Sequence, residues 1–166
     1  MKKTLLFILI IFVLLLGRCR YKSNDIRKNH VKLIGIKIPN EAEILELNDS
    51  HGGFHGDGVY YEEIQLEKEI VNEFASNALE KVGWRKLPMS KELHKLIFGE
   101  RTVDYSYGGR GEMIPNYIKH GIFYYRDKKT NSFSDDSVNL YDSSHNFIFS
   151  ILDFETGKLY ILEFDS

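Results

Sequence analysis

Asp49–Gly58, with the sequence DSHGGFHGDG, separates two segments that have the composition of β-strands. The preceding segment, Glu43–Leu47, mixes glutamate with branched aliphatic residues, and the following one, Val59–Leu66, is rich in β-branched and aromatic residues. Glycine adopts the positive φ angles of tight turns at little cost. The glycine-rich stretch therefore predicts the tip of an antiparallel hairpin.

Two helices are predicted after this hairpin. In Glu67–Val82 the apolar residues recur at three- and four-residue spacing, which predicts a long amphipathic helix. Ser90 is a suitable N-cap for a shorter helix at Lys91–Phe98, and Gly99 is suited to end it. The apolar stripe of the long helix consists of Ile70, Val71, Phe74, Ala75, Ala78, Leu79 and Val82.

The remaining predicted strands lie at the two ends of the globular part. Gly121–Arg126 is a strand candidate, and Phe147–Phe154 and Leu159–Phe164 flank the turn Glu155–Lys158 as a second hairpin. Val31–Ile38 alternates in part and predicts a short strand or an extended lead-in.

The order of these elements defines a fold class. Strands and helices are grouped and do not alternate as βαβ units, so we expect an α+β fold. Its antiparallel sheet, with the element order β-β-α-α-β-β-β, would pack on the one long amphipathic helix. A chain of 166 residues with 43% hydrophobic residues can bury one core, and we expect a single domain at residues 31–166.

The charge is distributed unevenly along the chain. Residues 1–28 contain seven basic residues and one acidic residue, a net charge of +6, so a chain of net charge −2 carries −8 in the remainder. A domain this acidic is unsuited to binding a phosphate backbone, and nucleic acid is not an expected partner. Cys19 is the only cysteine, which excludes an intramolecular disulfide and a cysteine zinc cluster.

The N-terminus has the pattern of a membrane anchor. Thr4–Gly17 is an unbroken apolar run behind Lys2 and Lys3, and as a helix it would be about 21 Å long. We expect a signal-like or transmembrane anchor at residues 1–17, a basic linker at 18–30, and a domain outside the cytoplasm at the cell membrane, because the short basic N-terminus and the signal-like core favour export. The alternative is a cytoplasmic domain, which the basic residues that follow the run favour by the positive-inside rule. Cys19 follows the run as an acylated lipoprotein cysteine would, but Arg18 stands where such a protein has a small residue.

The hairpin tip contains the candidate site. Asp49, His51, His55 and Asp57 are the candidate ligand-binding residues, and His51, His55 and Asp57 could hold a divalent metal such as zinc. The spacing is not that of a helical H-E-x-x-H motif. The alternative is a hairpin whose glycines serve the turn and whose histidines lie at the surface.

Other motifs give less chemistry. Gly108–Glu112 could cradle an anion through backbone N–H groups, but it lacks the lysine and hydroxyl residue that end a P-loop, and a simple connecting loop is the favoured interpretation. Ser134–Ser137 does not match an EF-hand loop. The sequence has no G-x-S-x-G nucleophile motif, so catalysis is the minority hypothesis.

Several features together carry a family resemblance. They are Asp49–Gly58 before a strand ending in Gln65-Leu66, then Trp84–Pro88, Asp135-Asp136-Ser137 and the hairpin Phe147–Phe164. With these features, residues 34–166 resemble a family of short membrane-anchored proteins of Gram-positive bacteria of the Bacillus and Clostridium kind. The resemblance implies a membrane-tethered protein and brings no catalytic residue with it.

Three functional hypotheses follow. The first is a non-enzymatic, membrane-tethered domain that binds a small ligand or a protein partner through the loop of His51 and His55. The second is an immunity-type protein that protects its own cell from a secreted toxin. The third is a metal-dependent hydrolase with His51, His55 and an aspartate as ligands.

Overall fold

The computed structural model describes residues 30–52, 56–101 and 106–166. The chain divides into two compact units, Met1–Ile38 and Pro39–Ser166. The predicted anchor, Cys19 and His55 lie outside the described residues. Among the residues that are described, no helix has both the length and the apolar character needed to cross a membrane.

In the first unit, the predicted strand at Val31–Ile38 is wrong, because residues 30–34 are helical. The backbone N–H of Gly35 donates to the carbonyl of Val31 at 3.1 Å, and Gly35 has a φ of +72°. A glycine in this left-handed conformation is a common helix terminator. The prediction was wrong because it relied on the β-branched residues of the segment and did not recognise Gly35 as the residue that ends a short helix.

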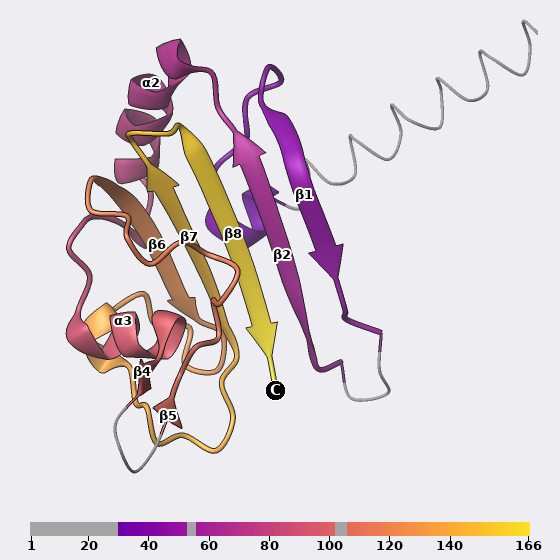
Figure 1. The fold of residues 1–166 in the computed structure, drawn as a ribbon, viewed down its shortest axis with the longest axis vertical. Coiled ribbons are helices and arrows are strands. Elements are labelled where there is room, and N and C mark those ends of the chain that lie inside the picture. Colours follow the sequence, from indigo (N-terminus) through magenta and orange to yellow (C-terminus); the bar gives the residue numbers. More distant parts are fainter. Residues whose placement is uncertain (1–29, 53–55, 102–105) are drawn as a thin grey trace, which may run out of the picture. The chain divides into compact units, whose positions relative to one another are not determined.

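The second unit is built on a six-stranded sheet with the order β1-β2-β8-β7-β6-β3, in which every neighbouring pair is antiparallel. Figure 1 shows the first hairpin lying beside the last strand of the chain. The predicted α+β class and both predicted hairpins are confirmed. The strands are β1 (Glu43–Asp49), β2 (Gly58–Gln65), β3 (Trp84–Lys86), β6 (Gly121–Asp127), β7 (Phe147–Asp153) and β8 (Lys158–Asp165).

The predicted element order is wrong, because three short strands were missed. They are β3 and the pair β4 (Glu100–Arg101) and β5 (Ser106–Tyr107), which forms a separate two-stranded sheet. Strands of two or three residues are too short to show an alternating pattern. In β3, Trp84 lies opposite Tyr124 of β6, and its ring packs edge-on against Phe74 with centroids 6.1 Å apart.

The helices are shorter than the predicted long amphipathic helix. Helix α2 (Lys68–Leu79) buries Val71, Phe74, Ala75 and Ala78, but it ends before Val82, which is 72% exposed. The chain turns at Gly83, with a φ of +94°, so that Trp84 can enter the sheet. The prediction extended the helix to Val82 because the three- and four-residue spacing of apolar residues extends to Val82, although Val82 is not buried.

Helix α3 (Lys91–Phe98) is confirmed, together with both of its predicted ends. The Ser90 hydroxyl accepts a hydrogen bond from the Leu93 N–H at 3.1 Å, and Gly99 is the C-cap. A side-chain N-cap of this kind satisfies one of the N–H groups that the first turn leaves unpaired.

The two helices cover opposite faces of the sheet. Phe74 of α2 packs on Trp84, on the Tyr124 side, whereas the buried residues of α3 contact the face of Tyr125. Neighbouring residues of a strand point to opposite faces, so α2 lies on the face of Tyr124 and α3 on the face of Tyr125. The core on the α3 side consists of Tyr61, Leu93, Leu96, Ile97, Ile114, Phe123, Tyr125, Phe147, Phe149, Ile151, Tyr160 and Leu162.

The glycine segment Gly108–Glu112 packs on the C-terminal end of α3. The N–H groups of Arg110 and Gly111 donate to the carbonyls of Leu96 and Ile97 at 3.2 and 2.7 Å. These carbonyls belong to the last turn of a helix, where no intrahelical partner remains. The two N–H groups are therefore engaged with the helix, which removes them from the anion cradle considered from the sequence.

Substitution of Gly108 should separate steric contact from backbone strain. Gly108 and Gly109 both have positive φ angles, +68° and +76°, but a Cβ on Gly108 would lie 1.8 Å from the Lys95 carbonyl oxygen, whereas the nearest atom to one on Gly109 is 3.4 Å away. We expect Gly109→Ala to lower the free energy of unfolding by about 1–2 kcal/mol. Gly108→Ala should lower it by more than about 4 kcal/mol. Urea unfolding would measure both, and equal losses would contradict the packing described for Gly108.

Candidate functional site

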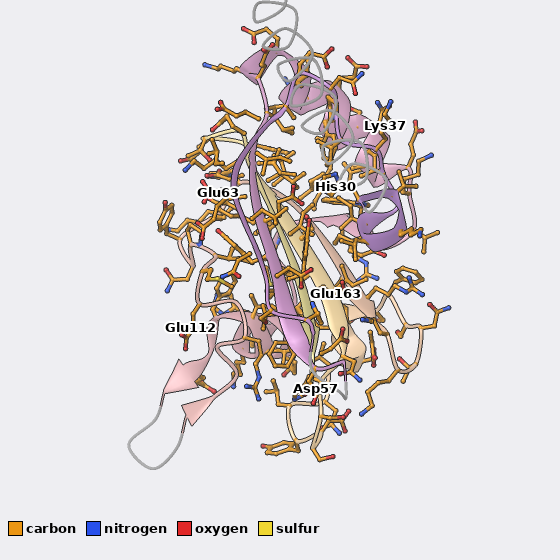
Figure 2. All side chains as sticks on the ribbon, turned by 90° about the vertical axis from the view of Figure 1, so that its right-hand side faces the viewer. His30, Lys37, Asp57, Glu63, Glu112 and Glu163 are labelled. Atoms are coloured by element: carbon orange, nitrogen blue, oxygen red, sulfur yellow. The ribbon has the colours of Figure 1, made fainter. Side chains whose placement is uncertain are left out.

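The predicted site residues lie at the end of the β1–β2 hairpin, where β1 leads into residues 50–57. Ser50 and Val59 close this end with three hydrogen bonds, two backbone–side chain and one backbone–backbone. Figure 2 shows Asp57 at the same end of the sheet. In this view the labelled side chains of Glu63 and Glu163 lie on opposite sides of the sheet.

His51 is held by Asp49 through two contacts. The Asp49 Oδ1 lies 2.8 Å from His51 Nδ1 and accepts a hydrogen bond from the His51 backbone N–H at 3.0 Å. The His51 side chain is 22% exposed, and that of Asp49 is 49% exposed. The side chains of two of the candidate ligand-binding residues are thus in direct contact.

The other ring nitrogen of His51 faces a residue from the last strand. His51 Nε2 lies 3.3 Å from Asp165 Oδ2, which is within ion-pair distance but lacks the geometry of a hydrogen bond. The imidazole is therefore positioned between two carboxylates, one before it in the chain and one at the end of β8. We name the side chains of Asp49, His51, Lys128, Glu163 and Asp165 the His51 cluster.

Strand register and one glycine create this arrangement. Gly58 is paired with Asp165 in the β2–β8 ladder, so the loop after β1 reaches the end of β8. A Cβ on Gly58 would lie 2.7 Å from the His51 backbone nitrogen and 2.9 Å from its Cδ2. The absence of a side chain at Gly58 thus leaves the space that the His51 ring and backbone occupy.

Lys128 connects the remaining carboxylates of the cluster. Its Nζ lies 2.5 Å from Glu163 Oε1 and 2.8 and 2.7 Å from the two Asp165 carboxylate oxygens. Burial alone would lower the pKa of Lys128, but its hydrogen bonds to Asp165 and Glu163 outweigh burial and raise the pKa. Lys128 therefore stays charged and neutralises part of the acidic end.

Sequence reasoning missed Lys128, Glu163 and Asp165, because they are remote from the glycine-rich stretch in the chain. The available signal was the acidic end of the last predicted strand, since an antiparallel partner of β2 would bring that end to the start of β2. Because the strand order could not be predicted, the sequence did not show which residues this acidic end lies beside.

Of the predicted site residues that the structure describes, Asp57 does not contact Asp49 or His51. Asp57 is exposed and makes no ion pair or hydrogen bond with the described residues, and His55 lies outside them. Within residues 30–52, 56–101 and 106–166, no group of three His, Cys, Asp or Glu side chains is arranged to hold a metal ion. The metal set His51, His55 and Asp57 therefore stays a prediction.

Comparisons with known proteins add no identification. No family model matches the sequence, and neither the curated proteins nor the solved structures contain a match.

The Asp49–His51 contact should be visible in the titration of Asp49. Burial would raise the pKa of this carboxyl, but the hydrogen bonds from the side chain and backbone of His51 lower it below the ordinary value of 3.8. The contact therefore stabilises the fold above that pH, and this contribution is lost as the pH falls through the lower, folded value. We expect His51→Ala to raise the pKa of Asp49, as measured by carboxyl-carbon NMR.

A second histidine provides the control for this titration. His120 is highly exposed, and its Nε2 lies 3.9 Å from a Glu155 oxygen, away from the His51 cluster. His120→Ala should leave the pKa of Asp49 unchanged. An Asp49 pKa that is the same in His51→Ala and the wild type would show that the contact does not persist in solution.

Proposed function

We propose that this chain is a membrane-tethered domain on the outer face of the cell membrane, which binds a cationic ligand or partner through the His51 cluster without catalysing a reaction. The tethering rests on the apolar run Thr4–Gly17 and the basic residues around it. The resemblance to membrane-anchored proteins of Gram-positive bacteria supports the same placement. The binding role rests on the geometry of the cluster.

The observation that carries the binding role is the convergence of three carboxylates on one imidazole and one ammonium group. Asp49 and Asp165 face the two ring nitrogens of His51, and Glu163 joins Asp165 at Lys128. The groups are held by strand ends and by one another, so little conformational entropy remains to be lost when a ligand binds. A preorganised, acid-rich surface favours a positively charged ligand.

The same geometry favours binding over catalysis. A histidine that acts as a general base needs a ring nitrogen within reach of the proton that it removes. Here Nδ1 contacts Asp49, and Nε2 faces Asp165 and is buried. Neither nitrogen is presented to a substrate, and the cluster contains no hydroxyl or thiol nucleophile.

Exposed acidic residues also lie along β1, which is the first strand in the sheet order. The β1–β2 register places Glu43 and Glu46 on one face of the sheet and Asp49, with the His51 cluster, on the other. Together with the net charge of −8 beyond residue 28, these carboxylates on both faces favour a basic protein or peptide. An immunity-type protein, which would cover a basic toxin, is the most specific form of this proposal.

The binding role can be tested with a labelled hexalysine peptide and its hexaglutamate counterpart, added to the full chain in a neutral detergent. We expect the lysine peptide alone to bind, as measured by fluorescence anisotropy, and to bind more weakly as salt is added. Asp49→Asn and Asp165→Asn should each raise Kd about 2- to 5-fold, as expected for an exposed ion pair.

Glu155 provides the matched control for these variants. Its side chain is 72% exposed and lies in the β7–β8 turn, away from the His51 cluster. Glu155→Gln removes one negative charge from the chain and should leave Kd unchanged. Equal effects of all three substitutions on Kd would show that the peptide is attracted by the net charge of the chain and does not bind at the His51 cluster.

A metal-dependent hydrolase is the second candidate function, and one observation favours it. Metal-binding histidines commonly direct one ring nitrogen to a carboxylate, as His51 Nδ1 does to Asp49 Oδ1 at 2.8 Å. The opposing observation is that Asp165, which faces the other ring nitrogen, is already paired with Lys128 at 2.7 Å. A metal ion there would have to displace an ammonium group.

Metal analysis separates the two functions. The full chain is exposed to zinc, dialysed and assayed beside the double variants His51→Ala/His55→Ala and His94→Ala/His120→Ala. We expect no stoichiometric zinc in any of the three. Stoichiometric zinc that is lost only from the His51/His55 variant would establish the metal site and favour the hydrolase.

A further inference from the structure

A second candidate site is a cavity of about 330 Å³ that is lined by the end of β6, the start of β7 and the segment that connects these two strands. Its floor is formed by Tyr125 and Phe147, whose ring centroids are 6.2 Å apart, and its walls are formed by the turn after β6 and the loop before β7. Lys128 belongs to the same turn, but its side chain extends to Glu163 and Asp165 in the His51 cluster. The cavity is therefore separate from the site already described.

The charged groups of the cavity are satisfied within the protein. The Asp127 carboxylate accepts hydrogen bonds from the N–H groups of Lys129 and Thr130 and from the Thr130 hydroxyl. Lys129 Nζ donates to the carbonyl and the hydroxyl of Ser144, at 3.2 and 3.3 Å, and lies 3.9 Å from Asp142 Oδ2. Each of these charged side chains is thus engaged by hydrogen bonds or an ion pair within the protein.

Asp142 completes this internal pairing. Its Oδ1 accepts a hydrogen bond from Asn139 Nδ2 at 3.0 Å, while its Oδ2 faces Lys129. The carboxylate thus keeps lone pairs that can accept hydrogen bonds from hydroxyl groups, while one of its oxygens already faces an ammonium group of the protein.

The groups with open hydrogen-bonding capacity are uncharged. No hydrogen bond within the described part of the chain uses the Tyr125 hydroxyl or a ring nitrogen of His145. The side-chain oxygen of Asn146 accepts from the Ser166 N–H, which leaves the two N–H groups of that amide for a ligand. The cavity thus offers a hydroxyl, an imidazole and an amide.

The electrostatic surroundings keep two of these groups neutral. Burial raises the pKa of Tyr125, and Asp127 and Asp142 add to the effect, so that the hydroxyl keeps its proton. Burial lowers the pKa of His145, and nearby Arg110 and Lys129 lower it further. Asp142 raises the pKa but does not outweigh these effects, so the ring is uncharged at neutral pH.

From this arrangement we propose that the cavity binds an uncharged, hydroxyl-rich molecule of the size of a mono- or disaccharide. Such a ligand can fill the open donors and acceptors with its hydroxyl groups and place a C–H face on the rings of Tyr125 and Phe147. A charged ligand would lose hydration and would have to compete with protein groups that already bind the charged side chains of the cavity, and an apolar one would leave the polar groups unsatisfied. The volume lies within the range of small-molecule sites.

The test compares sugars that share a ring and differ in charge. Glucose, galactose and N-acetylglucosamine are the neutral probes, and glucosamine and glucuronate are the charged ones. They are added at millimolar concentration to the full chain, and binding is followed by the NMR signals of Tyr125, His145 and Asn146. We expect at least one neutral sugar to shift these signals and to bind more tightly than either charged sugar.

Two substitutions connect the binding to the cavity. Tyr125→Phe removes one hydroxyl and keeps the ring of the floor, and it should raise the Kd of the neutral sugar about 3- to 10-fold. Tyr117→Phe removes a hydroxyl from a side chain that is 68% exposed and does not line the cavity, and it should leave Kd unchanged. If Tyr125→Phe does not fold, His145→Gln takes its place with the same expected loss.

Three outcomes would overturn the proposal. They are no shift of the three signals with any neutral sugar, tighter binding of glucosamine or glucuronate, and a Kd that the Tyr125 and His145 substitutions do not change. None of these outcomes bears on the His51 cluster, whose test uses a different ligand and different variants.

Discussion

Pairing between β2 and β8 is the constraint on which the rest of this structure depends. Gly58–Gln65 is hydrogen-bonded along its whole length to Lys158–Asp165, so the hairpin that begins the globular unit is joined to the hairpin that ends it. A shift of one residue would move every side chain of β2 to the other face of the sheet. Tyr61 would then leave the core that it shares with α3, and Gly58 would no longer lie opposite Asp165. The same register thus determines the core and the surroundings of His51.

Both candidate sites arise at the end of the sheet where the strands stop, and one turn serves both. Lys128 extends from this turn to the carboxylates near His51, while Asp127 and Lys129 line the cavity above Tyr125 and Phe147. The chemistry of the two places differs accordingly. The first has more carboxylates than cations and suits a positive ligand, whereas the charged side chains of the second are engaged within the protein and its open groups are uncharged, which suits a neutral ligand. The β-strands supply fixed positions, and the connecting loops supply the polar groups.

The sequence predicted those parts of the fold that depend on local chemistry. Ser90 and Gly99 delimit α3 through a capping hydrogen bond and a left-handed glycine, and both signals are visible in the residues themselves. It failed where tertiary contacts decide. Trp84 joins the sheet by pairing with Tyr124 of β6, a residue 40 positions later in the chain. The apolar spacing of the helix extends to Val82, but the Val82 side chain is exposed and does not pack in the core. In the site, Asp49 and His51 are two residues apart and were found, whereas Asp165 reaches them only through the β2–β8 register, which no local pattern encodes.

The distance in sequence between β2 and β8 has a consequence during synthesis. Gln65 leaves the ribosome long before Lys158, its neighbour in the ladder, and at roughly 5–20 residues per second the gap lasts about 5 to 20 seconds. Throughout this interval β2 lacks the strand that covers one of its edges in the folded protein, so the backbone groups of that edge have no partner in β8. Edges of this kind are sites of intermolecular pairing. A chain of this topology is thus expected to depend on a chaperone, or on low local concentration, until its last strand is made.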